Sequence, residues 1–379
     1  MTESIHDIRK RESAHFLSRL ATDVELFTPN LRSRCTECIL SDAVAKFSEN
    51  GICEFCQNYT HLQQEQDKNQ LLIAELDSLL RSSSQSGLGT YDALLLYSGG
   101  KDSAYLLSEL TQRYPELRIL ALLIDNGFAS QVAFENTRFA FEKFDITHFV
   151  FTPKKSLYQK LFRHCVMNFH SRGGYETVDR ADGDLLFDIA KNLAVQLHIP
   201  LVLAGLSKAQ CEDILNLNRF EISPESLKFK RSEIAGFALS EIYEKADYRY
   251  WWDGTAVPEN LLPRIVFPFF CWEYDEAKIR NQVVERGLIP PGESDPIITN
   301  HRLIPLILAL DYLRLGYCTF EPEFAKLVRS GKSPRELWLP FFQALEHLVP
   351  KGEFMPQSIA RVLVDLELDP KALGIPLNL

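Results

Sequence analysis

Three features that the chain lacks narrow its class before any motif is considered. Its 379 residues contain no run of eighteen apolar residues, so the sequence predicts no membrane-spanning helix. The first residues, MTESIHDIRKRESAHF, contain no apolar stretch of the kind that directs secretion. Basic residues are outnumbered, with 41 Lys and Arg against 51 Asp and Glu, which disfavours a broad nucleic-acid-binding face. We therefore expect a cytoplasmic protein with no membrane contact, and the acidic balance disfavours a nucleic-acid partner without excluding one.

Cysteine is present in a pattern that predicts a metal site. In a reducing compartment the eight cysteines point to metal ligands or reactive thiols before disulfides. Cys35, Cys38, Cys53 and Cys56 form C-x₂-C-x₁₄-C-x₂-C, in which two knuckles place four thiolates around one tetrahedral Zn²⁺. An iron–sulfur cluster and unligated thiols are the alternatives. Because four sulfurs leave no open coordination position, zinc here would be structural.

A second pattern lies between Tyr91 and Leu107, in the stretch YDALLLYSGGKDSAYLL. It predicts a short apolar strand over Ala93–Tyr97, a glycine turn, and a helix that opens near Ser103. A buried strand that runs through glycines into a helix N-terminus suits anion binding, because the helix presents unpaired N–H groups and the glycines admit a phosphate. An ordinary turn of an α/β protein is the alternative.

The turn is not a Walker A loop, which requires G-x-x-x-x-G-K-[ST]. Leu95 occupies the first glycine position, and Asp102 separates Lys101 from Ser103. The turn resembles instead the PP-loop (SGGxDS) of the N-type ATP pyrophosphatases, also called adenine nucleotide alpha hydrolases. The resemblance implies an enzyme that grips pyrophosphate while ATP gives up AMP to an acceptor oxygen. It assigns ATP binding to Ser98, Gly99, Gly100, Lys101, Asp102 and Ser103.

Within that assignment the serines and glycines would cradle the β- and γ-phosphates. Lys101 and Asp102 would be catalytic: the lysine adds positive charge, and the aspartate holds Mg²⁺ or orients the loop. The resemblance also implies that a loop starting at Gly205, after a strand over 199–204, faces the nucleotide. Asp125, which follows a strand over 117–124, is placed to meet the adenosine half of ATP or to cap a turn.

Cys211 is a candidate nucleophile. It stands near a predicted helix N-terminus and near Lys208, and both features lower a thiol pKa and favour the thiolate. A buried, inert cysteine is the alternative interpretation.

The C-terminal part predicts long helices and carries two weaker resemblances. The cysteine pattern and the tail LVRSGKSPREL resemble N-acetyl sugar amidotransferases and related PP-loop enzymes that install sulfur in small molecules. The tail predicts a helix that starts with Ser333 as its N-cap, and Arg329 and Arg335 could reach an anion. His301 stands where several PP-loop relatives have a cysteine, which removes one thiol from a two-cysteine sulfur mechanism.

The expected fold is α/β, with a parallel five-stranded sheet of the PP-loop type, an N-terminal zinc ribbon and a helical C-terminal region. The expected divisions are an extension over 1–34, the zinc ribbon over 35–58, a helix and linker over 59–88, the ATP pyrophosphatase domain over 89–240, and a mainly helical region over 241–379.

The expected reaction is adenylylation of a carbonyl or amide oxygen on a small molecule, followed by replacement of AMP by sulfur. The expected cofactors are ATP, Mg²⁺ and structural Zn²⁺, and the expected partners are the acceptor and a sulfur-donating lyase or desulfurase. The alternative is an N-acetyl sugar amidotransferase in surface-polysaccharide synthesis, supplied with ammonia by a glutaminase subunit. A zinc-ribbon interaction protein with an inactive nucleotide fold is a third class. Self-association into a homodimer is left open.

Overall fold

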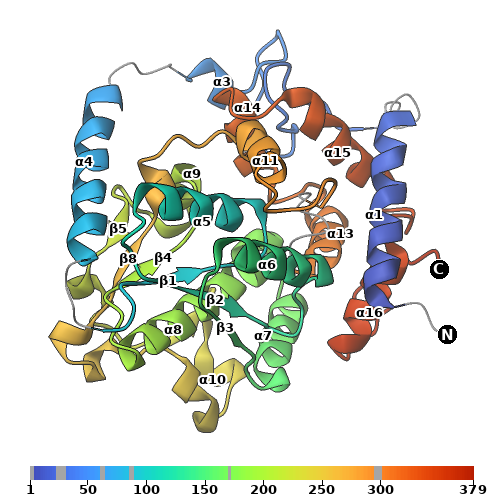
Figure 1. Ribbon diagram of the computed structural model, residues 1–379. Helices are drawn as coiled ribbons and strands as arrows, with labels where there is room; N and C mark the ends of the chain where they lie inside the picture. Colours follow the sequence, from blue (N-terminus) through green and yellow to red (C-terminus); the bar gives the residue numbers. More distant parts are fainter. Residues whose placement is uncertain (1–3, 23–30, 60–64, 85–88, 170–171, 294–300) are drawn as a thin grey trace. The chain divides into compact units, whose positions relative to one another are not determined.

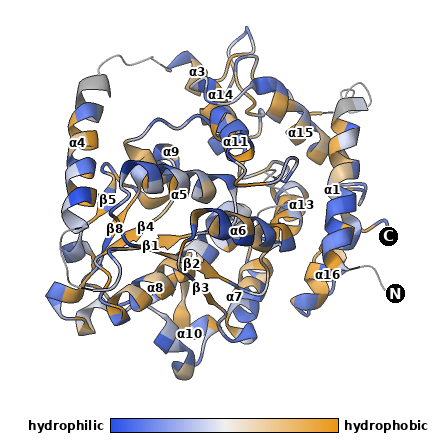
Figure 2. Cartoon of the chain, viewed as in Figure 1, coloured by the Kyte–Doolittle hydropathy of each residue, from blue (hydrophilic) through white to orange (hydrophobic). Residues whose placement is uncertain are grey.

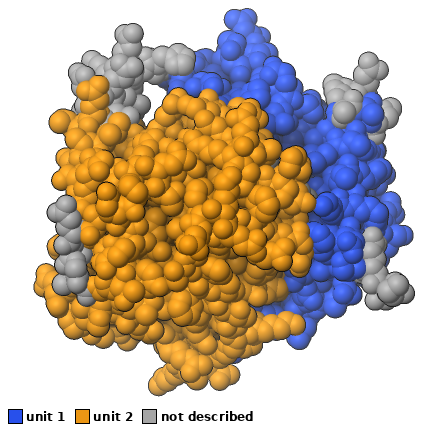
Figure 3. Space-filling model, in the orientation of Figure 1, with its two compact units in different colours: residues 1–61, 159–181, 295–379 blue, residues 62–158, 182–294 orange. Residues whose placement is uncertain are grey.

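The structure, a computed structural model, describes residues 4–22, 31–59, 65–84, 89–169, 172–293 and 301–379. The chain divides into two compact units (Figure 3). Unit 1 comprises residues 1–61, 159–181 and 295–379, and unit 2 comprises residues 62–158 and 182–294. The domain divisions expected from the sequence stay predictions. Of the helices within the described ranges, none is both long enough and apolar enough to cross a membrane.

Unit 2 contains a mostly parallel sheet of six strands in the order β3-β2-β1-β4-β8-β5. Its strands are β1 (Ala93–Leu96), β2 (Ile119–Ile124), β3 (His148–Phe151), β4 (Leu201–Leu203), β5 (Glu221–Ile222) and β8 (Arg264–Val266). All neighbours pair in parallel except β5 and β8, which are antiparallel. The α/β fold with a parallel sheet is thus confirmed, but the count of five strands is wrong. The additional strand, β5, is too short at two residues to show a strand period in the sequence.

Apolar runs form the centre of this sheet. Every residue of β1, β2 and β4 is buried, as expected for parallel strands that are covered on both faces. Figure 2 shows these strands as hydrophobic, and Figure 1 shows α5 (Lys101–Arg113) and α6 (Gln131–Phe144) on one side of the sheet and α8 (Arg180–Gln196) on the other. β3 is an edge strand, and its first three residues are exposed.

The remaining α-helices of unit 2 are α4 (Glu65–Ser83), α9 (Lys208–Leu215), α10 (Leu239–Ile242) and α11 (Glu276–Glu285). A hairpin of β6 (Glu233–Ile234) and β7 (Phe237–Ala238) forms a second, two-stranded sheet. α7 (Lys155–Met167) includes the division between the units at residues 158 and 159.

Unit 1 is helical around α13 (Ile304–Leu315), which is buried at every residue from Ile304 to Tyr312. Within its described ranges the other α-helices are α1 (Ile5–Thr22), α3 (Glu54–Gln57), α14 (Glu321–Arg329), α15 (Arg335–Leu348) and α16 (Pro356–Asp365). α15 begins one residue later than the sequence predicts. Its N-cap is Pro334, not Ser333, and the Ser333 hydroxyl accepts a hydrogen bond from the indole N–H of Trp338 (2.8 Å).

Gly173 and Gly174 lead into a short π-helix over Tyr175–Asp179, and both glycines pack closely on α13. A Cβ on Gly174 would lie 1.9 Å from the Ile307 Cγ2 atom, and the Gly174 N–H donates to the Asp311 carboxylate (2.8 Å). The φ of Gly174 is −70°, so contact with α13, and not backbone strain, requires glycine here.

We therefore expect Gly174→Ala to lower the free energy of unfolding by about 1–3 kcal/mol, the usual cost of forcing a methyl group into a packed core. Gly183→Ala is the matched control, because a Cβ at this position in α8 meets nothing within 4 Å. It should be neutral or stabilising by up to about 1 kcal/mol. Urea denaturation of both variants checks this, and equal stabilities would contradict the contact.

Candidate active site and metal centre

The loop between β1 and α5 has a conformation that only glycine can adopt. Gly99 has a φ of +76°, and a Cβ on it would lie 2.1 Å from the carbonyl oxygen of Ala133 in α6. The buried Asn136 side chain, one turn further along α6, donates to the Gly99 carbonyl (3.1 Å). Contacts with α6 therefore fix the backbone at the first glycine of the motif.

The two serines of the motif close the loop on itself. The Ser98 N–H donates to the Ser103 hydroxyl (3.3 Å), and the Gly100 N–H donates to the Ser98 hydroxyl (3.3 Å). The Ser103 hydroxyl in turn donates to the Gly100 carbonyl (3.0 Å). Gly100 is the N-cap of α5 and has no side chain with which to cap it, so no side chain caps the first turn of this thirteen-residue helix, an arrangement that suits an anionic ligand.

Three side chains are hydrogen-bonded to one another beside the start of α5. The buried Lys101 amine donates to both carboxylate oxygens of Asp102 (3.0 and 2.8 Å) and to the Tyr274 hydroxyl (3.3 Å). The Tyr274 hydroxyl donates to Asp102 Oδ1 (2.8 Å). About a third of the Asp102 side chain is exposed, so its carboxylate can offer oxygen to a hard cation such as Mg²⁺. The sequence analysis missed Tyr274, which lies in the aromatic stretch FPFFCWEY and has no distinguishing signal there.

The loop after β4 lies against the same helix start. A Cβ on Gly205 would lie 3.4 Å from the carbonyl oxygen of Asp102, so the structure brings Gly205 to the motif. Asp125 follows β2, the neighbour of β1, at the same edge of the sheet. Its Oδ1 atom accepts from the Gly127 N–H (2.9 Å), which is the turn-capping contact that the alternative interpretation expects. The ATP-binding roles of Gly205 and Asp125 stay predictions.

Cys211 is buried, and its pKa moves in the direction opposite to the one expected. Burial raises the pKa of the thiol, and the neighbouring Glu212 and Cys271 raise it further. Lys208 does not offset this effect, since its amine lies 3.9 Å from the Glu212 carboxylate. The predicted lowering of the pKa is therefore wrong, because helix position alone does not tell whether a side chain meets solvent.

The other three cysteines outside the metal motif are also buried, protonated thiols. Burial raises the pKa of Cys165 and of Cys271 to about 12, and it raises the pKa of Cys318 as well. His301, which stands in place of a relative's cysteine, belongs to unit 1 and lies 3.4 Å from the Asp179 carboxylate. Burial thus disfavours the thiolate form at all four of these cysteines.

The four cysteines of the knuckles do come together. Their sulfur atoms all lie within 4.8 Å of one another, with 3.8 Å between Cys35 and Cys56 and 3.7 Å between Cys38 and Cys53. Cys35, Cys38 and Cys53 are fully buried, whereas Cys56 is partly exposed. Four converging sulfur ligands fit a thiophilic metal ion or cluster.

No protein-family model and no curated protein matches the chain. Among solved structures it is similar to the U34-tRNA thiolase NcsA from Methanococcus maripaludis with its 4Fe-4S cluster, at 12% identity over 92% of this chain and 91% of that chain, with a TM-score of 0.34. It is also similar to a phosphoadenylyl-sulfate reductase from Candida auris, at 14% identity over 69% of this chain and 95% of that chain, with a TM-score of 0.32. A third similar structure is the NH3-dependent NAD synthetase from Campylobacter jejuni, at 10% identity over 72% of this chain and 95% of that chain, with a TM-score of 0.30.

Strand, loop and helix stand around the Ser-Gly-Gly-Lys-Asp-Ser motif as the PP-loop resemblance requires, within a mostly parallel sheet. A four-cysteine cluster precedes them in the chain. These elements therefore agree with the local fold that the PP-loop resemblance implies.

The raised thiol pKa of Cys211 has a direct chemical consequence. Thiolate is the reactive form, so iodoacetamide should modify native Cys211 at pH 7.5 at least about tenfold more slowly than the same cysteine in urea, whose pKa is near 8.5. Because the native pKa is raised, the native rate should keep increasing as the pH rises through 9. Peptide mass spectrometry measures both rates, and native labelling as fast as unfolded labelling would restore Cys211 as a reactive thiol.

Proposed function

We propose that this protein is an enzyme that uses Mg-ATP to adenylylate a carbonyl or amide oxygen of a small molecule and then exchanges that oxygen for sulfur. The observation that carries the proposal is the loop from Ser98 to Ser103, with Gly99 fixed against α6 and the start of α5 open to an anion. A phosphate chain fits this place, because backbone N–H groups and a helix dipole favour negative charge.

In the first step the acceptor oxygen attacks the α-phosphorus of ATP, the bond between the α-phosphorus and its bridging oxygen breaks, and pyrophosphate leaves. The loop N–H groups and Lys101 hold the β- and γ-phosphates, so they stabilise the charge that develops on pyrophosphate. Asp102 would hold Mg²⁺, which supplies further charge neutralisation. Tyr274 keeps Lys101 and Asp102 in place through its hydroxyl.

In the second step sulfide adds to the activated carbon, the carbon–oxygen bond breaks, and AMP leaves with the acceptor's oxygen. The product keeps a carbon–sulfur double bond. Cys211 and the other leftover thiols are buried, and burial raises their pKa values, which supports a sulfur supplied from outside by a lyase or desulfurase partner. Ammonia in place of sulfide would make the same intermediate the substrate of an amidotransferase.

We further propose that the cysteine cluster holds one zinc ion. A tetrahedral site with Zn–S bonds of about 2.3 Å separates its sulfurs by about 3.8 Å. The separations of 3.8 and 3.7 Å between paired cysteines support a single ion over a four-iron cluster, whose thiolates sit on separate iron atoms and lie farther apart. Metal analysis of anaerobically purified protein checks this: one zinc per chain is expected, and four irons would contradict it.

Donor competition tests the sulfur assignment. We would incubate the protein with Mg-ATP and a panel of lactam, purine and N-acetyl sugar acceptors, with sulfide or ammonia as the donor, and measure pyrophosphate and product mass. We expect pyrophosphate release that depends on an acceptor, together with a sulfur-containing product. Turnover with ammonia alone would reject sulfur transfer in favour of amidation. No ATP consumption with any acceptor would reject the enzyme and favour the inactive nucleotide fold.

Tyr274→Phe should reduce the rate of pyrophosphate formation by about ten- to a hundredfold, because a hydrogen bond to a charged group contributes about 1.5–3 kcal/mol. The ring is retained, so its contact with Phe269 and the fold should be unchanged. Tyr250→Phe is the control, since the hydroxyl of Tyr250 meets only the exposed Arg249 among the hydrogen-bond partners seen for it. Equal rates for the two variants would remove Tyr274 from the site.

A further inference from the structure

Two arginines of the C-terminal segment LVRSGKSPREL contact the cysteine knuckles. Arg335, the first residue of α15, donates from Nε to the carbonyl of Cys38 (2.7 Å) and from Nη2 to the carbonyl of Cys35 (2.9 Å). Arg329, the last residue of α14, donates from Nη1 to the sulfur atoms of Cys38 (3.8 Å) and Cys56 (4.0 Å). The sequence suggested that both arginines could bind an anion. In the structure Arg329 contacts cysteine sulfur atoms, and Arg335 contacts backbone carbonyls of two of the same cysteines.

A buried ion network joins the first knuckle to the same two helices. Arg34, the residue before Cys35, lies 3.2 Å from the Glu321 carboxylate and 3.0 Å from the Glu346 carboxylate. Ser41, which pairs with Arg34 as an isolated β-bridge, donates from its hydroxyl to Glu321 (3.0 Å). Glu321 belongs to α14 and Glu346 to α15, and Arg34 and Glu321 are almost fully buried. Both ends of the knuckle are thus anchored to these helices.

The charge on the cluster explains why a cation stands beside it. Four thiolates around one divalent ion keep a net charge of −2, and burial makes an uncompensated charge costly. Arg329 supplies a positive charge and hydrogen bonds to two of the sulfurs.

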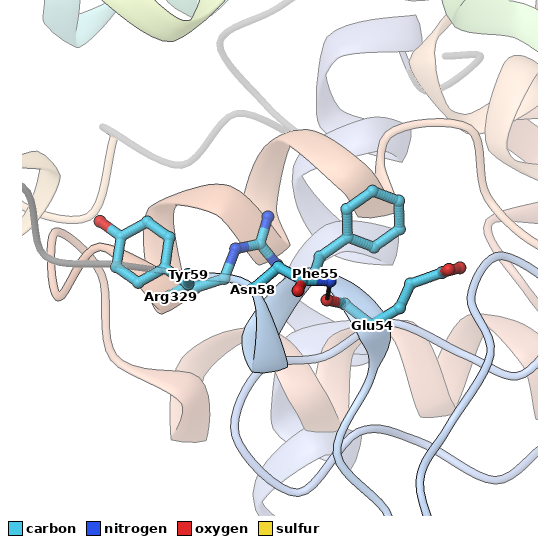
Figure 4. Close-up of a pocket in the computed structure, with 5 residues that line it drawn as sticks. All are labelled: Glu54, Phe55, Asn58, Tyr59 and Arg329. Atoms are coloured by element: carbon cyan, nitrogen blue, oxygen red, sulfur yellow. Dashed lines mark hydrogen bonds between the residues drawn. The ribbon is translucent and has the colours of Figure 1, made fainter.

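Arg329 also separates the sulfurs from an open pocket of about 460 Å³, lined by Glu54, Phe55, Asn58, Tyr59 and Arg329. Figure 4 shows the Arg329 guanidinium between the rings of Phe55 and Tyr59, which lie 5.8 and 6.0 Å away. Cys56 is the partly exposed ligand of the four, and Arg329 contacts its sulfur. This side chain therefore stands where a chelator would approach the metal.

We propose that Arg329 and Arg335 are outer-sphere residues of the metal site, and that the bound metal, through them, fastens helices α14 and α15 to the cysteine knuckles. Arg335 fixes the carbonyls of the first knuckle, and Arg329 balances the charge of the thiolates and shields them from the pocket. The metal is then a folding cofactor for the C-terminal helices of unit 1. The inference does not depend on the proposed ATP chemistry.

Metal release from the full chain loaded with Zn²⁺ tests the two arginines. Loss of an outer-sphere partner typically weakens metal binding ten- to a hundredfold. We therefore expect Arg329→Ala and Arg335→Ala to release zinc to a colorimetric chelator about ten times faster than wild type, or more. Arg361→Ala, at an exposed position of α16, is the matched control and should release zinc at the wild-type rate. Wild-type release rates for both arginine variants would overturn the proposal.

Hydrogen exchange of the wild-type protein gives a second test that needs no variant. Chelation should remove amide protection from residues 321–348, which form α14 and α15, while α5 in unit 2 keeps its protection. Restoring Zn²⁺ should restore the protection. If chelation removes the zinc and residues 321–348 stay protected, the metal does not fasten these helices, and the proposal fails even where the variants lose metal.

Discussion

The candidate nucleotide site depends on one close approach, of the Gly99 backbone to the carbonyl of Ala133. The approach is possible because Gly99 has no Cβ and adopts a φ that other residues rarely take. It fixes the turn between β1 and α5, and with it the open helix start and the Lys101–Asp102 pair. The N–H groups at the start of α5 are therefore oriented before any ligand arrives, which is the condition under which they stabilise charge effectively.

Unit 1 depends in a similar way on the cysteine cluster, because this unit is built from three separate stretches of the chain. Arg34, Glu321 and the arginines of the C-terminal segment join the knuckles to α14 and α15 by buried ion pairs and hydrogen bonds. Buried charges of this kind stabilise only when every partner is present, so the metal, the knuckles and the helices are expected to order together.

Local sequence patterns predicted the parts of the structure that local interactions determine. The apolar run before Ser98 and the glycines after it identified β1, the loop and α5, and cysteine spacing identified the cluster. The parts that were missed depend on partners distant in sequence. Tyr274 is recognisable only beside Asp102, and β5 only beside β8. The burial of Cys211 likewise depends on what packs over α9, so its thiol pKa could not be read from its position near a helix start.

The central claim is that the loop holds the two outer phosphates while the bond between the α- and β-phosphates of ATP breaks. Two ATP analogues with a methylene bridge test it directly, because a P–C–P linkage cannot be cleaved in this way. In the presence of a working acceptor and donor, the enzyme should convert β,γ-methylene-ATP to AMP and leave α,β-methylene-ATP intact. Cleavage of the α,β-methylene analogue to release orthophosphate, with no AMP from the other, would contradict the account.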